Sequence, residues 1–182
     1  MRLTRTLMLA ATAALALAAC EKKTDTTTPP AAKEAAGDET LAKGIPADSK
    51  MGAALHAAGL DATLAGPGPY TVLVPDDAAF AKLPAGTLDN LLKPEARADL
   101  TALLTYHILP GTILADDIGK AIDAGKGKAV LATMGGGTLT ATKSSNGILL
   151  TDASGGTATI GKAEDKRSNG VIHHIDGVLK PS

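Results

Sequence analysis

The pattern of apolar and polar positions divides the chain into three stretches. Residues 7–19 are apolar, without a charge or a helix breaker, and residues 21–40 are rich in Thr, Pro, Ala, Lys and Glu. From residue 41 onward, short apolar runs alternate with Gly, Pro and Asn. The middle stretch contains almost nothing that can form a core, so it is predicted to be a disordered tether. Residues 41–182 are predicted to form one domain of common size.

Helical patterns dominate the first half of this domain. Residues 49–58 have a capping side chain at their start, either Asp48 or Ser49, and Gly59 at their end. The run YTVLV at 70–74 is β-branched and predicts a buried strand. A further short helix is predicted to begin at 78–80, capped by the Pro75-Asp76-Asp77 segment, and others at 87–92 and 94–107, the last being the longest.

Short strand patterns dominate the second half. Gly135-Gly136-Gly137 and Ser144-Ser145-Asn146-Gly147 are typical of hairpin turns between them. Because helices come first and strands mostly after, the pattern favours an α+β fold with a mainly antiparallel sheet. The strands are predicted at 112–114, 129–133, 138–143, 147–151, 158–161 and 171–179.

Residues 1–19 are typical of a cleaved signal peptide. Arg2 and Arg5 precede the apolar run, which is too short for a membrane-spanning helix of roughly 20 residues. The end of the segment, Leu17-Ala18-Ala19-Cys20, resembles the lipobox of bacterial lipoproteins. That resemblance implies that Cys20 carries the lipid and that residues 20–40 tether the domain to a membrane. An ordinary secretory cleavage site beside a bystander cysteine is the alternative.

Charge and composition limit the kinds of partner that the chain is expected to bind. Removing residues 1–19 leaves 16 basic residues against the 19 acidic ones, a formal charge of −3. The sequence has no basic stripe and almost no aromatic residues, which argues against a nucleic-acid partner. Glu21 stands where Asp commonly retains Gram-negative lipoproteins in the inner membrane, so the outer membrane is favoured.

Three segments together resemble the fasciclin (FAS1) domain family: 68–80 (GPYTVLVPDDAAF), 104–111 (LTYHILPG) and 168–181 (SNGVIHHIDGVLKP). The resemblance covers about residues 45–181. It implies a β-sandwich-like wedge of short strands with helices packed around it. It also implies a role in adhesion or protein contact outside the cell rather than catalysis. The motif residues that it marks are Tyr70, Thr71, Pro75, Asp77, Phe80, Tyr106, His107, Asn169, Gly170, His173 and Asp176.

Most of these residues are expected to be structural. The only aromatic side chains, Tyr70, Phe80 and Tyr106, all lie in the matched segments and are expected to anchor the core. His107 follows the longest helix and is expected to bond its last carbonyls. Asn169-Gly170 is expected to turn the chain into the last strand, with Asp176 accepting backbone hydrogen bonds beyond it.

His173 and His174 are the one pair that suggests a metal. On a strand, neighbouring side chains point to opposite faces, so the two cannot readily share one ion. A site would need His56 or His107 brought in by the fold, and no acidic or cysteine ligand pattern accompanies them. We therefore expect no metal and no cofactor.

The first hypothesis is a non-enzymatic adhesion or interaction module in the cell envelope, with an unknown envelope protein or matrix polymer as its partner. The alternative is the binding of a small apolar ligand such as a carotenoid, which some fasciclin relatives bind. An enzyme is the third hypothesis. The run Asp152-Ala-Ser-Gly-Gly156 fits a serine-protease loop poorly and is better explained as turn material, so no residue is assigned a catalytic role.

Overall fold

The computed structural model describes residues 38–181, without the side chains of residues 162 and 163. The predicted signal peptide, Cys20 and the tether as far as residue 37 lie outside the described residues. No helix in the described part of the chain is long and apolar enough to cross a membrane. The helices are α1 (Leu41–Gly44), α2 (Lys50–Ala58), α3 (Asp61–Ala65), α4 (Asp77–Ala81), α5 (Thr87–Leu91), the 3-10 helix η1 (Pro94–Ala96), α6 (Arg97–Tyr106) and α7 (Ala115–Ala124).

The strands form one seven-stranded sheet in the order β2-β1-β7-β6-β5-β4-β3. All neighbours are antiparallel except β1 and β7, so the predicted mainly antiparallel sheet is confirmed. The Met134 N–H donates to the Ile108 carbonyl at 2.8 Å and joins the end of β3 to β2, which nearly closes the sheet into a barrel. The strands are β1 (Tyr70–Pro75), β2 (Ile108–Pro110), β3 (Lys128–Ala132), β4 (Thr138–Ser144), β5 (Gly147–Thr151), β6 (Thr157–Arg167) and β7 (Gly170–Ile175).

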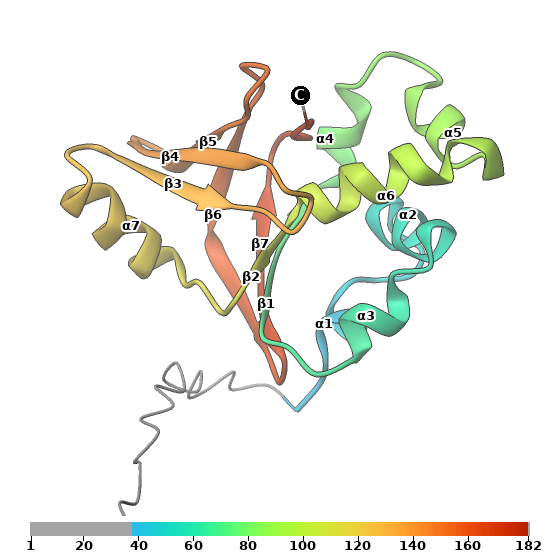
Figure 1. Cartoon of the computed structure of the whole chain (residues 1–182), viewed down its shortest axis with the longest axis horizontal. Coiled ribbons are helices and arrows are strands. Elements are labelled where there is room, and N and C mark those ends of the chain that lie inside the picture. The colour runs from blue at the N-terminus through green and yellow to red at the C-terminus, as the bar shows by residue number, and fades with distance from the viewer. Residues whose placement is uncertain (1–37, 182) are drawn as a thin grey trace, which may run out of the picture. The chain divides into compact units, whose positions relative to one another are not determined.

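Two hydrophobic cores lie on opposite sides of β1 and β7. Figure 1 shows α1 to α6 on one side of these strands and α7, with β3 and β4, on the other. Val72 and Val74 of β1 pack into the first core, whereas Leu73 between them packs into the second. The prediction of a buried strand at 70–74 is confirmed, because both of its faces are covered.

Local signals explain the elements that were predicted well. The Ser49 side chain accepts a hydrogen bond from the Gly52 N–H at 3.0 Å, so Ser49 rather than Asp48 caps α2. Gly59 ends that helix in the left-handed conformation, with φ 76°. Both predicted hairpin turns are confirmed, because they connect β3 to β4 and β4 to β5.

Residues 108–124 depart from the prediction. The strand is at Ile108–Pro110, residues 112–114 are a loop, and the unpredicted helix α7 follows at once. The Ile113 N–H donates to Thr71 Oγ1 at 2.9 Å and its carbonyl lies 2.8 Å from His173 Nε2, so side chains take the place of a neighbouring strand. The helix α7 buries Ile118 and Ile122, which are four residues apart with charged residues on the other face, so the sequence held an amphipathic helical signal that the prediction missed.

The other differences concern boundaries. The predicted helix at 94–107 begins as the 3-10 turn η1 and is α-helical only from Arg97 to Tyr106. Helices α1 and α3 were not predicted, and β6 extends to Arg167. The last strand ends at Ile175 rather than Leu179. The Glu39 carbonyl accepts the Ser168 N–H at 2.9 Å, so the end of the predicted tether already belongs to the domain.

Candidate functional site

The three segments that carry the sequence resemblance become three adjacent strands. Strand β1 pairs with β2 in antiparallel register, Tyr70 facing Pro110. It pairs with β7 in parallel register, from Tyr70 opposite Gly170 to Pro75 opposite Ile175. Segments about 35 and 100 residues apart in the sequence therefore form one continuous structure at the centre of the domain. This structure is the candidate functional site.

Thr71 joins β1 to the loop that follows β2. Its hydroxyl donates to the Gly111 carbonyl at 2.7 Å and accepts the Ile113 N–H at 2.9 Å. The side chain is buried, and both hydrogen-bonding capacities of the hydroxyl are used within the protein. Thr71 therefore holds this loop in place and presents no group to a ligand.

His107 is buried at the end of α6, with 1% of its surface exposed. Its Nε2 accepts the Leu179 N–H at 3.1 Å, so the proton of the neutral ring is on Nδ1. That Nδ1 donates to the Leu103 carbonyl at 2.8 Å, one of the free carbonyls at the end of α6. Burial lowers the pKa of His107 from its ordinary value, outweighing the opposing effects of the Leu103 hydrogen bond and the Asp152 charge. The ring is a neutral link between α6 and the C-terminal segment.

His173 is completely buried on β7, whereas His174 beside it is exposed. The two side chains point to opposite faces, as the strand pattern predicted. His173 Nε2 donates to the Ile113 carbonyl at 2.8 Å, and its Nδ1 has no hydrogen-bond partner among the described residues. Burial is the main cause that lowers the pKa of His173. His174 Nδ1 lies 3.4 Å from Asp76 Oδ1 at the surface.

The three aromatic side chains lie on both sides of the sheet. Phe80 is buried in the first core, and the half-buried Tyr70 packs against that core. Tyr106 is buried in the second core, where its hydroxyl donates to the Thr138 carbonyl at 2.9 Å. Burial raises the pKa of the Tyr106 phenol. A Cβ at Gly137 would overlap the Tyr106 ring, so the glycine turn after β3 gives this ring its space.

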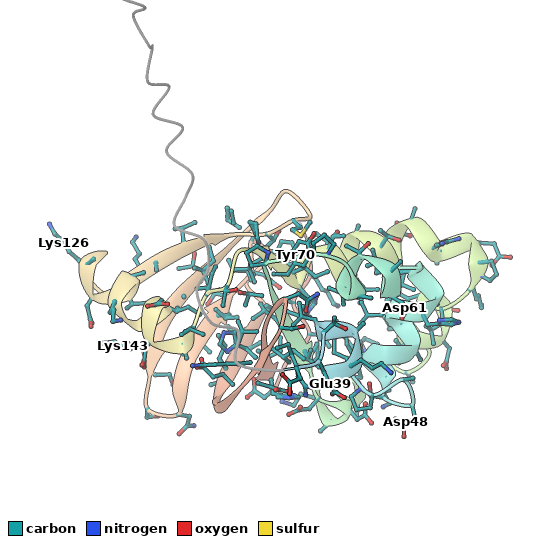
Figure 2. All side chains as sticks on the ribbon, turned by 90° about the horizontal axis from the view of Figure 1, so that it is seen from below. Glu39, Asp48, Asp61, Tyr70, Lys126 and Lys143 are labelled. Carbon is teal, nitrogen blue, oxygen red and sulfur yellow. The ribbon has the colours of Figure 1, made fainter. Side chains whose placement is uncertain are left out.

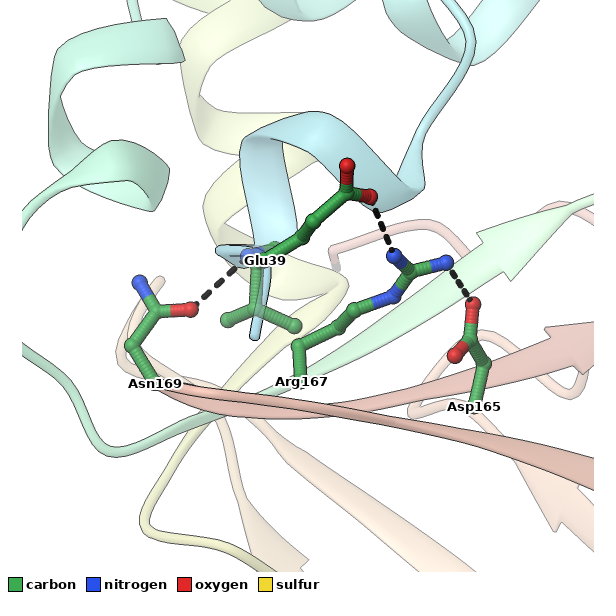
Figure 3. Close-up of polar contacts among 5 residues, drawn as sticks. Glu39, Asp165, Arg167 and Asn169 are labelled. Atoms are coloured by element: carbon green, nitrogen blue, oxygen red, sulfur yellow. Dashed lines mark hydrogen bonds and ion pairs between the residues drawn. The ribbon is translucent and has the colours of Figure 1, made fainter. Parts of the chain in front are cut away.

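Asn169 connects four parts of the chain through its side-chain amide. Its Oδ1 accepts the Leu41 N–H at 2.7 Å, and its Nδ2 donates to the carbonyls of Leu64 and Gly66 at 2.8 and 2.7 Å. Figure 3 shows the bond from Asn169 to the start of α1. The next residue, Gly170, must be glycine because a Cβ at this position would overlap the Tyr70 carbonyl oxygen on β1. Asn169-Gly170 thus fixes the end of β6 to α1 and α3.

The ion pairs around Asn169 were not predicted from the sequence. Arg167 lies between two carboxylates: its Nη1 donates to Glu39 Oε2 at 3.1 Å, and its Nη2 donates to Asp165 Oδ2 (Figure 3). The Asp165 carboxylate is the main cause that raises the pKa of Arg167. These contacts hold the N-terminal end of the domain, at Glu39, against β6.

The remaining predicted residues, Pro75, Asp77 and Asp176, lie at the end of β1 and around it. Pro75 is buried and ends β1. Asp77 is exposed at the start of α4, where its Oδ1 accepts the Lys50 N–H at 3.1 Å. Asp176 Oδ1 accepts the Thr159 N–H at 2.6 Å just beyond β7, so the predicted backbone hydrogen bond is confirmed.

Asp152 is the polar residue whose role sequence reasoning missed. Its carboxylate accepts the Ser154 and Gly156 N–H groups at 3.0 and 2.7 Å, and also the Lys180 N–H at 2.9 Å. These hydrogen bonds lower the pKa of Asp152, although burial, the largest single effect, acts in the opposite direction. Asp152 therefore organises its own loop and holds the C-terminal segment beside His107.

One open groove lies away from these strands, between α7 and the β4–β5 hairpin, with a volume of about 570 Å³. Its lining includes the apolar side chains Ile148 and Ile160, and Lys143 pairs across to Asp123 at 2.5 Å. Figure 2 shows Lys143 and Lys126 at the α7 end of the domain, opposite Asp48 and Asp61 at its helical end. Within residues 38–181, no group of three or more His, Cys, Asp or Glu side chains is arranged to hold a metal ion.

The fold is that of a known class of domain, the FAS1 domain. The FAS1 domain pair of the insect cell adhesion molecule fasciclin I matches 70% of this chain, with a TM-score of 0.50 and 23% sequence identity, and 40% of that structure is covered. The match establishes the α+β FAS1 fold, with its near-barrel wedge of mostly antiparallel strands and surrounding helices.

The chain belongs to the fasciclin domain family, whose sequence model matches residues 47–181. It is 38% identical over 147 residues to protein sll1483 of Synechocystis, covering 81% of this chain and 71% of that protein. It is also 41% identical over 130 residues to the pig transforming growth factor-beta-induced protein ig-h3. That match covers 71% of this chain but only 17% of ig-h3, so it concerns one domain of a longer protein.

Proposed function

We propose that this chain is a non-enzymatic adhesion or interaction module, displayed outside the cytoplasm on a lipid attached to Cys20. The observation that supports it is how the polar residues of the site are used. Thr71, His107, Asn169 and Asp152 bond the chain's own backbone. Such residues hold a scaffold in shape and leave its surface to make contacts. The name of the insect relative, a cell adhesion molecule, agrees with this role.

The proposal is tested by capture of a partner. The full chain, immobilised on vesicles, is incubated with cell-envelope extract and with extracellular matrix polymer from the same bacterium. We expect one component to be retained at high salt and released by excess soluble chain. Repeated failure to retain any component at high protein concentration would contradict the proposal.

Replacing Cys20 by Ser is expected to abolish membrane attachment. The wild-type chain, expressed in a Gram-negative host with an alkyne-labelled fatty acid, should carry the label and enter the detergent phase. Two or three acyl chains hold a protein on a membrane almost permanently, since each buried methylene contributes about 0.8 kcal/mol. The C20S chain should be unlabelled and found in the aqueous phase.

Nearby variants control this experiment. Lys23→Ser alters the same segment and should leave labelling unchanged. Glu21→Asp should keep the label but move the protein from the outer to the inner membrane in a density gradient. An unlabelled wild-type chain would show that Cys20 is a bystander to an ordinary cleavage site.

The groove beside α7 favours binding of a small apolar ligand as a second candidate function. Gly119 lies inside α7, where glycine costs roughly 1 kcal/mol relative to Ala. A Cβ on Gly119 would meet no described heavy atom within 4 Å, so packing does not require glycine there. Gly161 on the opposite wall has similar freedom, with a single neighbouring atom at 3.8 Å. These two positions keep the groove open.

Substitutions at Gly119 separate stability from ligand binding. Gly119→Ala is expected to raise the free energy of unfolding by up to about 1 kcal/mol and to leave the groove usable. Gly119→Leu should fill the groove and remove a co-purifying ligand, such as a pigment seen in an absorbance scan of protein from the native host. A colourless wild-type preparation rules out the pigment, and equal pigment content in wild type and G119L rules out this groove as its site.

A further inference from the structure

The outer face of strands β4, β5 and β6 carries a regular set of threonines. Along β4, Leu139 and Ala141 are buried in the second core, so the residues that alternate with them point outward. The same holds on β5 and β6, where Leu150 and Ala158 are buried. The outward residues, which we call the threonine face, are Thr138, Thr140 and Thr142 on β4, Thr151 on β5, and Thr157 and Thr159 on β6.

The strand register arranges this face in rows. Neighbouring strands are about 4.8 Å apart and alternate residues of one strand about 6.7 Å apart. The face is therefore a grid of hydroxyl and methyl groups. One row runs across Val130, Thr140, Thr151 and Thr157, and the next across Lys128, Thr142, Leu149 and Thr159.

The threonine face is open, and the six threonines that form it carry no charge. Helix α7 covers the opposite face of these strands, where Ile118 and Ile122 pack (Figure 1). Val130, at the edge of the face, has 66% of its surface exposed. Lys128 lies at one edge of the second row and the exposed Asp176, whose Oδ1 accepts the Thr159 N–H, lies at the other edge. Lys143 is turned away toward Asp123 on α7. The threonines themselves offer no charge, so a charged chain lying over them would lose solvation without gaining an opposite charge there.

The size of the face limits the partner. Four strands about 19 Å across and five residues about 17 Å long present roughly 300 Å². A stable protein interface needs about 800 Å² from each partner. The threonine face is too small for a stable protein complex and fits a narrow, repeating chain.

We propose that the threonine face binds an uncharged polysaccharide chain. Sugar rings offer hydroxyl groups at their rims and C–H groups on their faces, and each threonine offers a hydroxyl that donates and accepts together with a methyl group. Because the grid repeats, each contact can recur along the polymer. The inference rests on the proposed adhesion function and names its partner. A single contact of this kind is weak, but many copies of the protein anchored on one membrane bind the same polymer together and raise the overall affinity.

The test uses the full chain in dye-loaded phosphatidylcholine vesicles, mixed with microcrystalline cellulose and with chitin. The measured quantity is the fraction of dye that sediments with the polymer. We expect protein-bearing vesicles to sediment and bare vesicles to remain in solution. Carboxymethylcellulose, which carries charges on the same backbone, should compete about tenfold less well than uncharged, water-soluble cellulose fragments.

Variants identify the face. Replacing Thr140, Thr151 and Thr157 together by Val removes three hydroxyls while keeping shape and strand preference, and should reduce retention about tenfold or more. Thr140→Glu should abolish it. Thr63→Glu places the same charge on an exposed residue of α3 and should retain wild-type binding. Thermal unfolding of each variant reports on folding.

Three results would overturn the inference. The first is equal retention of wild type, T140E and the valine variant. The second is failure of wild-type vesicles to sediment with both polymers while flotation shows that the protein is on the vesicles. That result would leave the proposed adhesion function unaffected, because capture of a partner and labelling of Cys20 test it separately. The third is a protein captured from envelope extract by wild type and lost with T140E, which would assign the face to a protein partner.

Discussion

Lowering the pH from 8 to 5 is expected to reduce the free energy of unfolding by up to about 4 kcal/mol. His107 and His173 are buried and neutral, and burial lowers the pKa of each below the ordinary value of 6.5. Protonating His107 would place a proton on Nε2, facing the Leu179 N–H that now donates to it. A histidine that stays neutral in the folded state but is protonated in the unfolded state lowers the free energy of unfolding by about 1.4 kcal/mol for each pH unit below its unfolded pKa.

The direction follows from proton binding. Since the folded pKa is the lower one, the unfolded chain binds more protons below pH 6.5 and is favoured there. The stability that the histidines contribute is complete above 6.5 and is lost as the pH falls toward their folded pKa values. Asp152 acts in a lower window: its pKa is lowered from 3.8, so its contribution is present above 3.8 and is lost only as the pH falls through its folded pKa. Histidine protonation therefore weakens the fold first.

His107→Ala separates this effect from general acid sensitivity. At pH 8 the change should cost about 3 kcal/mol, because it opens a cavity and leaves the Leu103 carbonyl and Leu179 N–H without partners. As the pH is lowered, the free energy of unfolding of H107A should fall less steeply than that of wild type, because the variant takes up one proton fewer on unfolding. As a control, His56→Ala removes a histidine whose side chain is 87% exposed and contacts Asp61 at the surface, and it should cost less than about 1 kcal/mol at pH 8. Urea unfolding at a series of pH values measures both, and an unchanged pH slope in H107A would contradict the assignment.

Sequence patterns predicted the parts of the fold that short-range signals specify. The run at 70–74 and the two hairpin turns are correct because β-branched residues and clustered Gly and Asn act locally. The alternation of His173 and His174 follows from strand geometry alone. These signals, with three motifs in order, were sufficient for the fold class.

The missed features depend on contacts between distant residues. The loop at 112–114 has strand-forming residues, yet Thr71 and His173 supply its hydrogen bonds from 42 and 60 residues away. His107 was predicted to bond helix carbonyls, and one such bond is present, but its link to Leu179 crosses 72 residues. Asp152 appeared to be turn material because its bond to Lys180 is not visible in the local pattern.

Asn169→Ala is expected to lower the free energy of unfolding by about 3 kcal/mol, since three partly buried backbone groups lose their partner. These groups lie more than 100 residues away in sequence and belong to α1, α3 and the loop before β1. The loss should be largest at α1, which has four residues and depends on this bond and on Arg167. Hydrogen exchange of the Leu41 amide and tryptic cleavage after Lys43 should both become faster, and urea unfolding gives the global change.

Two variants show whether the amide itself is responsible. Asn169→Asp keeps an acceptor for the Leu41 N–H but cannot donate to the Leu64 and Gly66 carbonyls, so it should be about as unstable as N169A. Asn146→Ala alters an exposed hairpin tip and should change stability by less than about 0.5 kcal/mol. If N169D matched wild type, the two carbonyl bonds would contribute nothing. If Leu41 exchange were unchanged in N169A, Asn169 would not be what holds α1 to the sheet.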